Sequence, residues 1–197
     1  ILFHQIARTF PTQAKYDGFG HYTIQSKIPW TADSGTEDTQ FVLNSHTLST
    51  EFRPVNGWKI NIDYTYKSDN NFISDKRFTV DRYLTDQTKL PTANTVPSSI
   101  RQIHTQNIYW TSNLYSTYNL NIGDGHNFSV LGGLQYEYNE NNYLRGLKTS
   151  LIIEDVPSLQ TSVGEPSIYE SLGHFATQGI FGRVSYNYKE KYLFEAN

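Results

Sequence analysis

A strict alternation of side-chain character between Trp58 and Lys67 constrains this chain more than any other feature. In the stretch NGWKINIDYTYKSDN, apolar and aromatic residues occupy every second position, and polar or charged residues lie between them. Successive side chains of a β-strand point to opposite faces, so this segment is predicted to be a strand with one apolar and one polar face. Such a strand suits a soluble core, which buries the apolar face, or a membrane barrel, which exposes that face to lipid.

The same alternation recurs along the chain and predicts an all-β fold of antiparallel hairpins. With the opening segment it gives six strands. The other five segments are 39–54, 107–121, 127–139, 179–188 and 192–197.

The connections between the expected strands alternate in length. Short turns are expected at 53–57, 122–126 and 189–191, and the Asn-Gly and Asp-Gly pairs in two of them are typical of hairpin turns. Long connections are expected from 67 to about 103 and roughly from 143 to 173. All short turns then lie at one end of the sheet and all long loops at the other, which is the layout of an outer-membrane barrel.

Composition bounds the remaining classes. The chain has 197 residues, of which 37% are apolar and 15% aromatic, and its formal net charge is −3. That charge gives no basic surface for nucleic acid, and no apolar run is long enough for a transmembrane helix. The chain has neither cysteine nor methionine and begins ILFHQ, so we interpret it as an interior piece of a longer protein.

The alternation assigns residues to faces. If the fold is a membrane barrel, the apolar face contacts lipid and the other face lines a wet lumen. The expected lipid-facing residues are Trp58, Ile60, Ile62, Tyr64, Leu134 and Val184, and the expected lumen-facing residues are Asp63, Glu137, Arg183 and Glu195. Glu195 is expected to approach Arg183 across the short hairpin.

The long loops carry aromatic and charged side chains that suit contact with cargo or with a partner protein. These candidates are Phe72, Arg82, Tyr83, Tyr143, Arg145 and Tyr169. The pattern does not separate the two uses.

No catalytic or metal-binding motif is present. The histidines at 4, 21, 46, 104, 126 and 174 show no paired ligand spacing, and the sequence has no nucleophile elbow or phosphate-binding glycine loop. We therefore expect no enzyme activity, no metal and no cofactor. A soluble all-β glycan-binding module and a passive outer-membrane porin stay open as alternatives.

Two stretches resemble the barrel of SusC/RagA-type TonB-dependent transporters. One is HNFSVLGGLQYEYNENNY and the other is GIFGRVSYNYKEKYLFEAN, while RTFPTQAKYDG at 8–18 is a weaker match. In the second stretch the family pattern is matched at Gly179, Phe181, Gly182, Arg183, Tyr186, Tyr188, Lys189, Tyr192, Leu193, Glu195, Ala196 and Asn197.

This resemblance implies an outer-membrane barrel of about twenty-two strands around a plug domain, in a Gram-negative bacterium. It also implies a SusD-like lipoprotein partner and import of glycans, oligosaccharides or peptides driven by the TonB complex. Residues 1–197 would be a partial transmembrane barrel domain, because the plug and the remaining strands are absent from this sequence.

Overall fold

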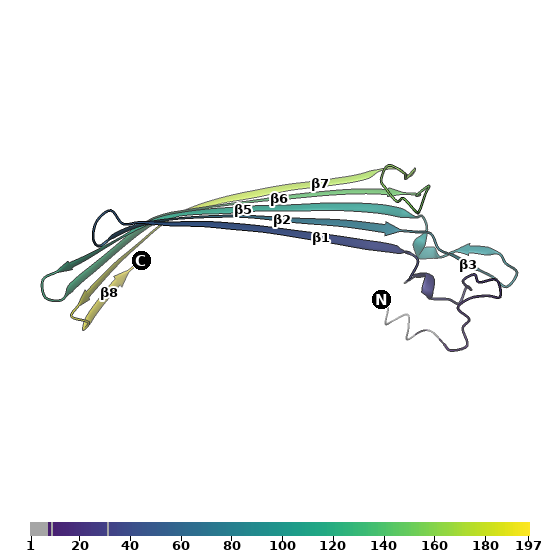
Figure 1. The fold of residues 1–197 in the computed structure, drawn as a ribbon, viewed down its shortest axis with the longest axis horizontal. Coiled ribbons are helices and arrows are strands. Elements are labelled where there is room, and N and C mark those ends of the chain that lie inside the picture. The colour runs from purple at the N-terminus through teal and green to yellow at the C-terminus, as the bar shows by residue number, and fades with distance from the viewer. Residues whose placement is uncertain (1–7, 9, 31) are drawn as a thin grey trace. The chain divides into compact units, whose positions relative to one another are not determined.

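The structure, a computed structural model, describes residues 8, 10–30 and 32–197. Five long strands and one short strand form one sheet in the order β1-β2-β5-β6-β7-β8, with β1, β2, β5, β6 and β7 side by side in Figure 1. Their bounds are Gly35–Phe52 (β1), Trp58–Arg77 (β2), Ser99–Ile122 (β5), His126–Thr149 (β6), Ser167–Tyr188 (β7) and Tyr192–Ala196 (β8). The predicted all-β antiparallel fold is confirmed.

Smaller elements lie in the connections. Strands β3 (Asp81–Tyr83) and β4 (Lys89–Pro91) form a separate antiparallel pair, and 3-10 turns occupy η1 (Ile28–Trp30) and η2 (Ala93–Thr95). The sequence did not predict β3 and β4, because three residues are too few to show a period of two. His4 and Thr9, which belong to the predictions from sequence, lie outside the described residues.

The chain divides into two compact units. Unit 1 contains Ile1–Gln40, Asn71–His104 and Tyr143–Glu170, and unit 2 contains Phe41–Asn70, Thr105–Asn142 and Ser171–Asn197. All three short turns fall in unit 2, and both long connections fall in unit 1. The predicted alternation of short and long connections is therefore confirmed.

The predicted bounds of the long connections were wrong. They span 78–98 and 150–166, because β2, β5, β6 and β7 all extend further than expected. Beyond the aromatic positions polar and apolar residues no longer alternate strictly, so the hydropathy pattern is lost while backbone pairing continues. Side-chain hydrogen bonds mark this polar part of unit 2, such as Gln106 Nε2 donating to Asn70 Oδ1 at 3.1 Å.

Backbone geometry explains the short turns. Gly57 has a φ of 83°, and a Cβ there would collide with the carbonyl oxygen of Asn119. Only glycine fits this turn without strain. Lys189 and Glu190 both have positive φ, and Lys191 N donates to Tyr188 O at 2.9 Å, as in a type I′ hairpin turn.

The small core lies where the first long connection meets the start of β5. Val80 and Ile100 are the buried apolar residues of the described chain. Thr95 Oγ1 accepts from Val80 N at 3.1 Å and donates to Thr92 O at 2.7 Å, which pins the connection. The long strands leave many large apolar side chains exposed, including Leu48 at 68% and Ile180 at 82%. Within the described residues, the structure has no helix long and apolar enough to cross a membrane.

Candidate functional site

The apolar and aromatic residues of unit 2 meet one another across neighbouring strands. Trp58 Nε1 donates to Ser116 Oγ at 2.7 Å, and the ring of Trp110 lies 4.9 Å from that of Tyr136 and 6.2 Å from that of Tyr64. By strand alternation, Ile60, Ile62, Leu134 and Val184 share this face. The aromatic residues that the sequence assigned to one face are thus gathered on it.

The opposite face of unit 2 carries the predicted polar residues. Arg183 Nε lies 2.7 Å from Asn197 Oδ1 and 3.6 Å from Glu195 Oε1, so the expected approach of Arg183 and Glu195 is present. Glu137 accepts from Thr177 Oγ1 at 3.4 Å, and Asp63 lies beside the hydroxyl of Tyr115. Among the described residues, no ion pair joins Asp63 or Glu137 to the Arg183–Glu195 pair.

A polar hollow on this face was missed from the sequence. It encloses about 430 Å³ and is lined by Lys67, Asp69, Asn107, Tyr109 and Asn139. Asp69 Oδ1 is buried there without a hydrogen-bond partner among the described residues. The polar residues that alternate with apolar ones in 59–69 and 107–121 line this face. They could have predicted a polar hollow, but the sequence prediction rested on the apolar positions between them.

Four of the predicted loop residues lie on strands of the six-stranded sheet instead. Phe72 belongs to β2, Tyr143 and Arg145 belong to β6, and Tyr169 belongs to β7. Their assignment to loops was wrong because it assumed that strands end where hydrophobic alternation ends. Their role in contacting cargo or a partner stays a prediction.

Three of these residues form one cluster in unit 1, hereafter the Tyr143–Arg145–Tyr169 cluster. The two tyrosine rings meet edge to face with centroids 5.8 Å apart, and the Arg145 guanidinium lies 5.7 Å from the centroid of the Tyr169 ring. Arg145 Nε is buried and has no hydrogen-bond acceptor in the described structure. The cluster offers two aromatic surfaces and one cation within a small area.

Phe72 lines an apolar groove in unit 1. Its ring stacks on that of His104 with centroids 4.3 Å apart and an interplanar angle of 7°. Leu144, Leu159 and Ile168 also line the groove, which encloses about 630 Å³. Gly146 makes room for Leu159, since a Cβ at Gly146 would lie 3.1 Å from Leu159 Cδ1.

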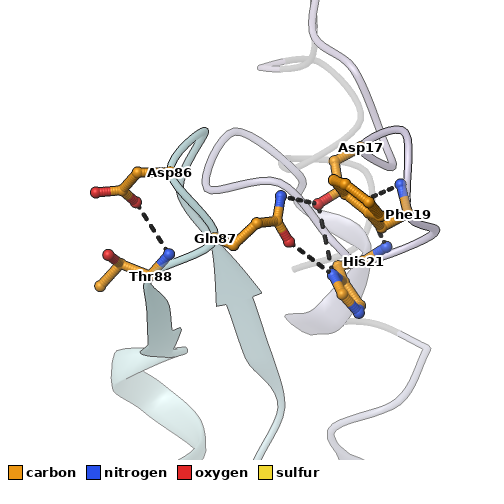
Figure 2. A network of polar contacts seen from close by, with 6 residues as sticks. All are labelled: Asp17, Phe19, His21, Asp86, Gln87 and Thr88. Atoms are coloured by element: carbon orange, nitrogen blue, oxygen red, sulfur yellow. Dashed lines mark hydrogen bonds and ion pairs between the residues drawn. The ribbon is translucent and has the colours of Figure 1, made fainter.

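Arg82 and Tyr83, in β3, hold the segment 14–24 rather than project freely. Arg82 Nη1 donates to the carbonyl oxygen of Ile24 at 3.0 Å, and the Tyr83 ring stacks on His21 with centroids 4.2 Å apart. Figure 2 shows the neighbouring polar network, in which Gln87 Nε2 donates to Asp17 Oδ2 at 3.0 Å. His21 Nδ1 lies 3.1 Å from Gln87 Oε1.

The electrostatics of this network stabilise the docked segment. The hydrogen bond from Gln87 lowers the pKa of Asp17 below its ordinary value, and the backbone N–H groups of His21 and Phe19 add to this effect against partial burial. The hydrogen bond and charge of Asp81 raise the pKa of Lys89, with their ammonium and carboxylate 2.7 Å apart. In the described part of the chain, no three His, Asp or Glu side chains lie close enough together to hold a metal ion.

The fold and its two-faced sheet define the class of structure: the chain has the fold of a segment of a transporter β-barrel. It matches a solved structure of the RagAB peptide transporter with a TM-score of 0.68 and 14% identity, over 82% of this chain and 17% of that chain. It matches the RagAB peptide importer in the closed-closed state with a TM-score of 0.70 and 15% identity, over 82% and 17%. It matches the RagAB peptide importer in the open-open state with a TM-score of 0.69 and 14% identity, over 91% of this chain and 19% of that chain.

These matches establish the fold. They confirm that the fold of this chain resembles SusC/RagA-type barrels, since RagA is SusC-like. The chain spans less than a fifth of the length of the structures that it matches. No family model matches the sequence, and no curated protein matches it. The matched structures are of a peptide transporter and of a peptide importer.

Proposed function

We propose that this chain is part of the barrel wall of a TonB-dependent outer-membrane transporter. In this proposal the transporter imports peptides, glycans or oligosaccharides together with a SusD-like surface lipoprotein. The observation that carries the proposal is the fold of the six-stranded sheet, which matches RagAB structures over 82% to 91% of the chain.

The two faces of the sheet support a membrane wall. In unit 2, one face gathers Trp58, Tyr64, Trp110 and Tyr136, and the other carries charged and amide side chains. Outer-membrane barrels place apolar residues toward lipid, aromatic residues at the interfaces and polar residues inside. We therefore assign the face of Ile60, Ile62, Leu134 and Val184 to lipid, and the face of Asp63, Glu137, Arg183 and Glu195 to the lumen.

The connections support the orientation of the wall. Unit 2 contains the short turns, which correspond to the periplasmic turns of bacterial barrels, and unit 1 contains the long connections, which correspond to extracellular loops. The Tyr143–Arg145–Tyr169 cluster and the groove beside Phe72 both lie in unit 1. Residues that contact incoming cargo or a surface lipoprotein belong on that side.

The two edge strands agree with a chain that works within a larger barrel. β1 and β8 end the described sheet, and each has a neighbour on one side only. Unpaired strand edges are not tolerated in a bilayer, so further strands must complete the wall. A passive porin would share this wall, and the presence of a plug domain in the whole protein would distinguish active uptake from passive flow.

The test uses the whole native protein from the outer-membrane fraction. Unboiled and boiled samples are compared on one denaturing gel, and the bands are identified by mass spectrometry. A band well above the 22.7 kDa of this chain that shifts on boiling supports an intact barrel, and a co-purifying lipoprotein supports the partnership. Depletion of peptides and oligosaccharides from the medium by wild-type cells, but not by a deletion strain, identifies the cargo class. A detergent-free protein of the size of this chain with no shift would refute the proposal and favour the soluble glycan-binding module.

A further inference from the structure

The Tyr143–Arg145–Tyr169 cluster contains a cation that no carboxylate of the described residues neutralises. Three other arginines are paired with carboxylates: Arg101 Nη2 lies 2.8 Å from Asp75, and Arg53 and Arg183 each lie within ion-pair distance of a glutamate. No carboxylate of the described chain lies within ion-pair distance of Arg145, whose recorded contact is with the ring of Tyr169. Its charge is therefore free to bind an external anion.

The setting of Arg145 favours a bound anion over water alone. The side chain is half-buried, and its Nε–H is covered without an acceptor. An unpaired charge in a partly buried position is energetically costly, and an anion at the terminal N–H groups of the guanidinium offsets that cost. Contact with the Tyr169 ring restricts the guanidinium, so little conformational freedom is lost when a ligand binds.

The geometry selects the chemistry of the anion. A guanidinium is planar and presents parallel N–H groups, which match the two oxygens of a carboxylate. The flanking tyrosines, whose rings meet at 66°, add flat apolar surfaces and hydroxyl groups beside the charge. A guanidinium flanked by two aromatic rings suits a carboxylate attached to a chain or ring that packs against an aromatic face.

The position of the cluster connects it to transport. Alternate residues of one strand share a face, so Tyr143 and Arg145 lie on the same face of β6 as Glu137. Under the proposed function this is the lumenal face, along which cargo passes. This step rests on that proposal, because a lipid-facing cluster would meet no soluble cargo.

We propose that Arg145, between Tyr143 and Tyr169, binds a carboxylate of the cargo during uptake. Two sources present this group: the C-terminus of a peptide and the acid group of an acidic sugar. The site binds a carboxylate more tightly than the neutral amide or ester of the same molecule. Cargo that carries a free carboxylate is therefore preferred, whatever the rest of its structure.

The experiment measures which ligands the whole native protein retains in detergent. The first probe is an equimolar mixture of randomised decapeptides without Asp or Glu, made with free carboxylate ends and with carboxamide ends. The second probe is a mixture of galacturonic acid oligomers and their methyl esters. Retained ligands are quantified by mass spectrometry for the wild type, Arg145→Gln, Arg145→Lys and Lys148→Gln. Lys148→Gln is the matched control, because it removes one positive charge from the opposite face of the same strand.

The expected result is enrichment of one acidic probe by about tenfold or more over its neutral form, as for hydrogen bonds to charged groups. Arg145→Gln removes the enrichment, Arg145→Lys keeps part of it, and Lys148→Gln leaves it unchanged. The enriched mixture identifies the source as a peptide or a sugar acid. Equal retention of acidic and neutral forms, or loss of the preference in Lys148→Gln as well, overturns the inference about Arg145. Neither result contradicts the proposed transporter function. If the wild type retains neither mixture, both the inference and the proposed cargo classes fail.

Discussion

Two adjacent glycines in β6 provide a sharp test of how the two faces of the sheet are packed. A Cβ added at Gly133 would lie 2.7 Å from Phe181 Cε2 and 2.8 Å from Tyr115 Cβ. A Cβ added at Gly132 meets nothing within 4 Å. Alanine at the two positions is chemically the same change, made on opposite faces of one strand.

The expected magnitudes follow from these contacts. Carbon atoms pack at about 3.5–4.0 Å, so alanine at Gly133 overlaps its neighbours by about 1 Å. Overpacking of this kind costs about 1–3 kcal/mol. Replacing glycine by alanine without strain gains about 0.4–1 kcal/mol, because the unfolded chain loses freedom. Gly133→Ala is therefore expected to destabilise the protein by about 1–2 kcal/mol, and Gly132→Ala to be neutral or slightly stabilising.

The assay is urea unfolding of the whole native protein in detergent, followed by tryptophan fluorescence. In a Phe181→Ala background the cost of Gly133→Ala should fall, because the ring of Phe181 supplies two of the three closest contacts. Tyr115 Cβ stays in place, so the relief should be partial. Equal unfolding midpoints for Gly132→Ala and Gly133→Ala would refute the described packing of Phe181 over β6.

Three further predictions concern the faces and the docked segment. Ile62→Arg should lower the amount of the whole protein in the outer membrane, since arginine at the bilayer midplane costs about 2–4 kcal/mol, whereas Asn61→Arg on the other face should not; equal levels on immunoblots would contradict the lipid assignment. Because the folded pKa of Asp17 is lowered, its stabilisation is present at neutral pH and is lost as pH falls below about 4. Protection of the amides of 15–23 against hydrogen exchange, taken relative to the intrinsic rate at each pH, should then fall with acid in the wild type and lack this step in Asp17→Asn. A double-mutant cycle on Arg183 and Glu195 should give a coupling below about 1 kcal/mol, because both side chains are about half exposed; a larger value would mean that this pair is shielded from solvent.

Much of the fold was predictable because its signal is local. Alternation in 58–67 and 127–139 gave the strands, and glycine-containing turns such as 53–57 gave the hairpins. The ends of the strands were not predictable by the same means. Where polar and apolar residues stop alternating, as in 139–149 of β6, backbone pairing continues without a hydropathy pattern to mark it.

The candidate site was predictable in its residues but not in its assembly. Tyr143, Arg145 and Tyr169 were chosen from sequence as aromatic and charged residues of supposed loops. Only the pairing of β6 with β7 brings Tyr169 to the other two, across a connection at 150–166. Arg82 shows the reverse case, because its side chain is held by the carbonyl of Ile24, a contact between distant segments that no local pattern encodes.

The sequence by itself determined that this chain forms hairpins with two unlike faces, since a period of two in side-chain polarity is a property of neighbouring residues. The tertiary structure decided which side chains meet. It placed the ring of Phe181 over Gly133, left Arg145 without a carboxylate from the described residues, and used Asp17 to dock a segment onto the turn at Gln87. These outcomes depend on strand register and on the paths of the long connections, which are fixed by contacts between residues far apart in the chain.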